Sequence, residues 1–113
     1  MMKYYTLETF QKVETAPGQF EHVAGPALVL GFDVDEQNSI LTAYVNGKTA
    51  KKAIAEDFGG NTFKIKARSI TARNGAAGLN KFLTEIYETG FMQSFLTTII
   101  KTTVYGIRHG QEI

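Results

Sequence analysis

The chain has 113 residues, of which 43% are hydrophobic and include eight Phe and five Tyr, and its formal net charge is +1. This is enough apolar material for one packed domain, so disorder of the whole chain is excluded. There is no cysteine, which excludes disulfides, thiolate metal sites and a cysteine nucleophile. No window approaches the roughly 18 apolar residues of a membrane helix, and no signal peptide is apparent, so we expect a cytoplasmic protein with no membrane partner.

The small net charge conceals an uneven distribution of charge along the chain. Residues 1–47 carry a net charge of −4, residues 48–81 carry +6 and residues 82–113 carry −1. Such asymmetry predicts a binding or steering surface in the middle of the chain, although it says nothing about the fold.

The first half of the chain has the pattern of β-strands. Aromatic, β-branched and polar residues alternate loosely over 3–13, and a short strand is predicted at 20–23 after the turn residues of 16–19, "APGQ". The run 27–34, "ALVLGFDV", is apolar almost throughout, as in a central strand covered on both faces. The polar stretch "DEQNS" then predicts a hairpin loop before a further strand at 40–45.

The second half mixes helices and strands. A short helix is predicted at about 48–58, where alanines and lysines end at Gly59-Gly60. A longer amphipathic helix is predicted at about 79–96, with an interruption at Gly90. The β-branched run "TTIIKTTVY" favours a strand from Thr98 to Ile107 over continued helix, and the tail 108–113 is expected to be exposed. We therefore predict one α+β domain over 1–113, a mainly antiparallel sheet with these helices packed on it.

The segment "FKIKARSITARNG", residues 63–75, is the candidate contact surface. In a strand, Lys64, Lys66 and Arg68 share one face, with cations about 7 Å apart. Other cations could widen this patch: Lys48, Lys51, Lys52, Arg73 and Lys81. Nucleic acid, an acidic protein, or simple protection of an edge strand by lysines each fit this pattern. A nucleic-acid groove usually interleaves aromatic residues with its cations, and here Phe63 falls on the opposite face.

No motif in the chain nominates a catalytic, metal or cofactor site. An EF-hand loop starting at Asp33 fails because Asn38 and Tyr44 occupy the positions that need Gly and Glu. His22 and His109 lie far apart without further ligands nearby, and no serine sits in a nucleophile motif. We therefore expect no cofactor and no enzymatic activity.

In general character the chain is similar to small accessory proteins of Gram-positive phages and conjugative elements. The features are its length, the absence of cysteine, a Thr-, Gly- and aromatic-rich composition, and stretches such as "TTIIKTTVYG" and "FGGNTFKIKAR". These proteins include the anti-CRISPR inhibitors of Cas9, which act by binding. The resemblance implies a non-enzymatic inhibitor of a host nucleoprotein complex, with Cas9 and its guide RNA as the partner. Because the middle of the chain is basic, contact with guide RNA or with an RNA-facing protein surface is expected rather than mimicry of DNA.

Two further hypotheses stay open. One is a small single-stranded nucleic-acid-binding protein built on a barrel-like sheet. The other is a homodimer, in which "TTIIKTTVY" would pair with its counterpart across a two-fold axis.

Overall fold

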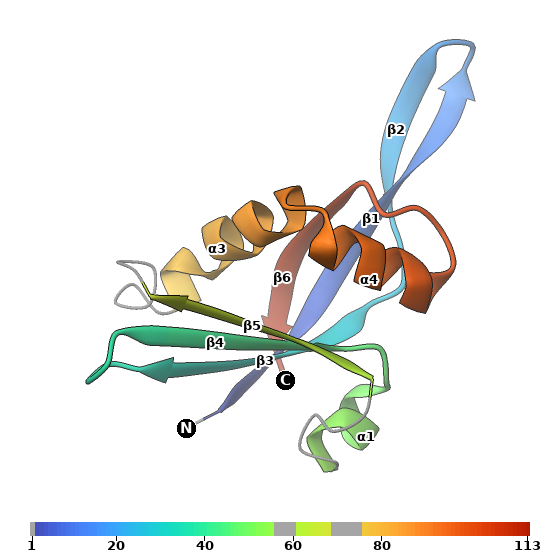
Figure 1. Cartoon of the computed structure of the whole chain (residues 1–113). Helices are drawn as coiled ribbons and strands as arrows, with labels where there is room; N and C mark the ends of the chain where they lie inside the picture. The colour runs from blue at the N-terminus through green and yellow to red at the C-terminus, as the bar shows by residue number, and fades with distance from the viewer. Residues whose placement is uncertain (1, 56–60, 69–75) are drawn as a thin grey trace.

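In the computed structural model, which describes residues 2–55, 61–68 and 76–113, the chain forms a six-stranded antiparallel sheet with three helices (Figure 1). The predicted α+β class is confirmed. The strands pair in the order β2-β1-β3-β4-β5, and β6 pairs with β1. The elements are, in chain order, β1 (Lys3–Ala16), β2 (Gln19–Ala24), β3 (Leu28–Asp35), β4 (Ile40–Asn46), α1 (Ala50–Ala55), β5 (Thr62–Arg68), α3 (Ala76–Glu88), α4 (Phe91–Ile100) and β6 (Gly106–Glu112).

The long strand β1 pairs with both β2 and β3, which lie one after the other along it. β1 pairs with β3 along its first part, from Lys3 to Leu7, and with β2 along its second, from Phe10 to Ala16. At the interruption the N–H of Gly25 donates to the carbonyl of Thr9 at 2.7 Å. The Thr9 hydroxyl donates in turn to the carbonyl of Pro26 at 2.8 Å. The hairpin turns at Gly18, whose φ of 75° is one that glycine adopts without strain.

β3 is the central strand, as its apolar run predicted. It lies between β1 and β4. Leu30 and Phe32 belong to the main core on one face of the sheet. On the other face Val29 packs with Ala53 of α1. The strand is therefore covered on both sides at this point.

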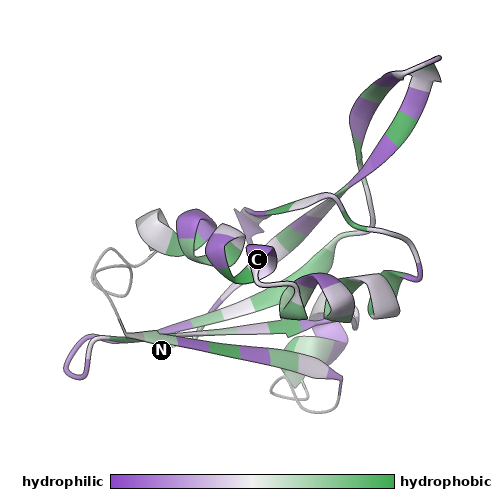
Figure 2. Cartoon of the chain, turned by 45° about the horizontal axis from the view of Figure 1, so that its top comes forward, coloured by the Kyte–Doolittle hydropathy of each residue, from purple (hydrophilic) through white to green (hydrophobic). Residues whose placement is uncertain are grey.

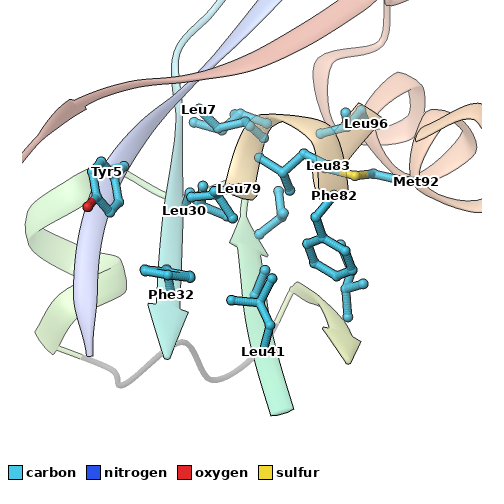
Figure 3. Packing of buried hydrophobic residues seen from close by; sticks show 14 of the residues in the cluster. Tyr5, Leu7, Leu30, Phe32, Leu41, Leu79, Phe82, Leu83, Met92 and Leu96 are labelled. Atoms are coloured by element: carbon cyan, nitrogen blue, oxygen red, sulfur yellow. The ribbon is translucent and has the colours of Figure 1, made fainter. Parts of the chain in front are cut away.

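The main core lies between the sheet and the two C-terminal helices, as Figure 3 shows. We call this side of the sheet the inner face. Leu7, Leu30 and Leu41 from the strands meet Leu83 of α3 and Leu96 of α4, all with no exposed surface. Burial of each such side chain contributes roughly 1.5–3 kcal/mol, so this layer dominates the stability of the fold.

The C-terminal third differs from its predicted boundaries. The helix does break at Gly90, whose φ is 89°, but α4 then continues to Ile100 rather than ending near Leu96. Ile99 and Ile100 pack against the core, and this packing outweighs the β preference of "TTII". Lys101, in the left-handed conformation, ends the helix. The strand predicted at Thr98–Ile107 is therefore wrong.

The tail is largely exposed, as predicted, and most of it forms β6, a strand that the sequence did not predict. This strand pairs with β1 from Tyr5 to Phe10, and the Arg108 side chain forms an ion pair with Glu8. The opposite edge of β1 was available, so the tail completes hydrogen bonds that would otherwise be left to water. Since 97–103 lie in α4 and in bends, a dimer through "TTIIKTTVY" strands does not fit this structure.

The far half of the first hairpin projects from the rest of the molecule (Figure 1), which measures 52 × 30 × 23 Å along its principal axes. We call residues 11–23 the arm. Beyond Phe10, β1 pairs only with β2 in the described structure. Hydrophilic and hydrophobic bands alternate along the arm in Figure 2, and Phe20 is 60% exposed. The arm thus lacks a core of its own.

Candidate binding face

The face of the sheet opposite α3 and α4 carries part of the predicted cationic set; we call it the outer face. On β5, Ile65 is buried while Phe63 and Ala67 pack against the main core. Lys64 and Lys66 alternate with them and are exposed. The predicted two-residue alternation is confirmed over the part of β5 whose side chains are described. The strand is also an edge strand, since its pairing runs only to β4 among the described strands.

An aromatic ring that the sequence did not nominate lies beside this strip. Tyr44 on β4 is the direct cross-strand partner of Lys64. The Lys64 Nζ lies 5.4 Å from the centre of the Tyr44 ring, within the range of a cation–π contact. The same row continues through Gly31 to Tyr4 on β1. Only the strand register could reveal this aromatic residue, because it lies 20 positions from Lys64 in the sequence.

Carboxylates share the outer face with these lysines. Asp33 lies in the row that runs through Thr42 to Lys66. Asp35 follows at the turn into β4, where its carboxylate accepts hydrogen bonds from the side chain and the backbone N–H of Asn38, at 2.8 and 3.2 Å. The Asn38 side-chain bond, more than any other contact, lowers the pKa of Asp35. The face is therefore mixed in charge, with its cations concentrated at the β5 edge.

The short helix α1 adds two lysines on the same side of the sheet. Its Ala53 is buried against Val29, which sets the helix on the outer face (Figure 1). Lys51 and Lys52 are exposed. The helix was predicted over 48–58; the structure has it at Ala50–Ala55, and residues 56–60 lie outside the described part. Lys48 precedes it in a half-buried turn, where its N–H donates to Asn46 Oδ1 at 2.8 Å.

Among the remaining predicted cations, Lys81 lies apart from this group. Lys81 is exposed on α3, which packs on the inner face. Arg68 ends β5 opposite Ile40, but its side chain lies outside the described part, as does the whole of Arg73. The +6 segment therefore does not form one patch. The structure places four of its lysines on one side of the sheet: Lys51, Lys52, Lys64 and Lys66.

Two ionisable side chains elsewhere in the molecule, His109 and Tyr87, make contacts within the fold. His109 on β6 stacks edge-on against Tyr5 at 5.3 Å, and its backbone N–H donates to Asn80 Oδ1. Tyr87 donates its hydroxyl to the carbonyl of Val104, and burial, with a smaller contribution from Tyr105, raises the pKa of this phenol. Within 2–55, 61–68 and 76–113, no three His, Asp or Glu side chains gather as a metal site would require.

None of the described helices combines the length and apolar character needed to cross a membrane. Comparisons of the chain with protein-family models, with curated proteins and with solved structures found no match.

Proposed function

We propose that this chain is a non-enzymatic binding protein that docks an acidic surface of a larger protein or ribonucleoprotein against its outer face. The contact residues are the four lysines of α1 and β5: Lys51, Lys52, Lys64 and Lys66. The observation that carries the proposal is the exposed pair Lys64 and Lys66 on a strand whose alternate side chains are in the core. A rigid strand holds these charges in place, so little conformational entropy is lost at the backbone on binding.

The mixed charge of the outer face favours a protein surface over a bare nucleic-acid strand. Phosphate binding draws on an uninterrupted cationic track, because each contact contributes through release of a counterion. Here the lysines lie at one edge, and Asp33 occupies the row of Lys66 two strands away. An interface of alternating signs is typical of protein partners, where complementary charges set orientation and association rate.

The resemblance to small proteins of phages and conjugative elements suggests the identity of the partner. We infer that the partner is a nucleoprotein complex of the Cas9 and guide RNA type, and that binding inhibits it. Capture of partners from a Gram-positive host, with and without nuclease treatment, distinguishes a direct protein contact from one bridged by RNA or DNA. Inhibition of target cleavage by purified Cas9 complexes is the direct test, and full cleavage at saturating protein would refute this assignment.

Charge reversal on β5 tests the contact face. We expect Lys64→Glu with Lys66→Glu to weaken partner binding by at least roughly tenfold, since opposed interfacial charges are replaced by repulsion. The matched control is Lys81→Glu with Lys101→Glu, which changes the net charge equally at exposed positions outside the outer face. Circular dichroism checks that both variants fold. Equal loss in the two variants would mean that only net charge matters.

A second candidate function is binding of single-stranded nucleic acid, which the Tyr44 and Lys64 pair favours because bases stack on such rings. Among the described strands β5 pairs with β4 alone, so the sheet is open at the β5 edge and differs from the predicted barrel-like form. Binding to oligonucleotides that falls steeply with salt, and that Tyr44→Leu weakens, would favour this candidate over the first.

A further inference from the structure

The edges of the sheet are protected differently. The β5 edge carries Lys64 and Lys66, the residues that proteins commonly use to block pairing with another sheet. The β6 edge meets α3, where Asn80 accepts the backbone N–H of His109. The β2 edge has no such cover in the part of the chain that the structure describes, and its Phe20 is 60% exposed. The far half of β1 is also unpaired on the side away from β2, but the residues whose backbone groups point there, Lys12 and Glu14, are charged. Among the open edges, β2 is therefore the one that carries a large exposed apolar side chain.

The backbone groups on the β2 edge can be assigned from the ladder with β1. The N–H of Gly25 bonds to the carbonyl of Thr9, so this pair exchanges hydrogen bonds across the hairpin. Because such pairs alternate along an antiparallel ladder, Val23 and Glu21 also bond to β1. The alternate residues of β2 are Phe20, His22 and Ala24, and their backbone N–H and C=O groups point to the free edge.

We propose that the β2 edge pairs antiparallel with the β2 edge of a second copy of this chain, about a two-fold axis at His22. In this register all three outward-pointing residues meet outward-pointing partners: His22 meets its own counterpart, and Phe20 meets Ala24 in both directions. Neighbouring registers are worse. An axis at Glu21 puts like charges directly opposite each other. An axis at Val23 puts Phe20 opposite Pro26, which has no N–H to donate.

The side chains on this edge are complementary in size. Phe20 is large and exposed, while Ala24 is small and has Phe10 beside it on β1. In the proposed pair, the ring of Phe20 from one copy covers Ala24 of the other and reaches the side of Phe10. Burial of this ring supplies apolar contact that the arm itself lacks.

With the axis at His22, the turn residues Pro17 and Gly18 of the second copy lie opposite Ala27 and Pro26. This is just before Val29, where β3 begins to pair with β4. The resulting sheet runs without interruption from one arm into the other, in a closed, symmetric assembly.

The charge of the arm favours a second copy over a nucleic acid. Its charged residues are Lys12, Glu14 and Glu21, a net charge of −1. An arm that enters a groove of DNA or RNA would need cations. Pairing of strand edges instead draws on the backbone and on Phe20. This proposal is independent of the outer-face lysines, which lie on β5 and α1.

A cysteine at the proposed axis tests the register. The chain has no cysteine, so His22→Cys introduces a single thiol that would face its counterpart at a Cα separation of about 5.5 Å, within disulfide range. We expect a covalent dimer to form rapidly under mild oxidation. The control is Val13→Cys, which is also exposed on the arm but faces neither the axis nor the second copy, and which should cross-link much more slowly. Equal rates for the two variants would overturn the proposal.

Sedimentation equilibrium of the unmodified chain measures the same contact without a cross-link. We expect a concentration-dependent dimer, and we expect Phe20→Ser to raise its Kd by roughly tenfold through loss of the buried ring. Because Phe20 is exposed in the single chain, this substitution should leave the fold intact, which circular dichroism would verify. A protein that stays monomeric up to roughly millimolar concentration, or a dimer that Phe20→Ser does not weaken, would overturn the proposal.

Discussion

The two halves of β1 belong to one strand but have opposite environments. In the first half Tyr5, Leu7 and Thr9 are buried, with β3 on one side and β6 on the other. In the second half, from Gln11 to Ala16, the strand pairs with β2 alone, no residue is buried and residues 12–15 are exposed. Both halves alternate polar and apolar residues. The number of neighbouring elements, and not the pattern of the strand, therefore determines how much each residue contributes to stability.

An isolated two-stranded ribbon is marginally stable in water. The arm extends this ribbon from the packed half of β1, with Thr9 and Gly25 at the junction. A partner for the arm, such as the second copy proposed above, would add the missing neighbour. Substitutions along β1 should therefore lower the free energy of unfolding strongly in its packed first half and only slightly in the arm.

The largest effect is expected from Leu7→Ala in the packed half. Leu7 has no exposed surface and lies among the side chains between the sheet and the helices (Figure 3). Removing its branched end leaves a cavity, and the free energy of unfolding should fall by about 2–5 kcal/mol. Urea unfolding followed by circular dichroism measures the change. A loss below about 1 kcal/mol would contradict the packed environment assigned to this half of the strand.

A smaller effect is expected from Thr9→Val at the junction of the halves. Valine keeps the shape of threonine but loses the hydroxyl that donates to Pro26. Thr9 is buried, so the carbonyl left without its donor should lower the free energy of unfolding by about 1–3 kcal/mol. The same unfolding assay applies, with Thr6→Val, half-exposed on the same strand, as the control. Equal changes in both variants would show that the Thr9 hydroxyl has no special role.

The smallest effect is expected from Val13→Ser in the arm. Val13 is 45% exposed and contacts no core residue, so the free energy of unfolding should change by no more than about 0.5 kcal/mol. Hydrogen exchange of the unmodified chain gives the complementary measurement. Amides of the arm should exchange faster than those of residues 4–9, because local opening of the two-stranded arm needs less free energy than opening of the packed half of β1. Equal exchange rates along all of β1 would contradict the difference in stability between its two halves.

Several predictions from sequence were correct because they depended on local patterns. The apolar run at β3, the turn at Gly18, the loop before β4 and the break at Gly90 all follow from residue size, φ preferences or spacing. The alternation on β5 likewise determined that Lys64 and Lys66 share a face away from the core. These features need no knowledge of distant residues.

Other features depended on contacts between distant residues. The continuation of α4 to Ile100 and the pairing of the tail as β6 were missed, because core packing and the open edge of β1 outweighed local propensity. Tyr44 was missed as the neighbour of Lys64, since only the register of β4 with β5 brings the two together. The packing of α3 on the inner face separates Lys81 from the lysines of the outer face.

By itself, the sequence determined which segments are strands or helices in most of the chain, which faces of those segments are apolar, and where positive charge is concentrated. These are properties of neighbouring residues, set by side-chain chemistry and backbone preference. The tertiary structure alone decided which strands are adjacent, which edge stays open and which charges lie on a common side. Those properties depend on how elements far apart in the chain pack together, and packing is decided by the burial of the whole core.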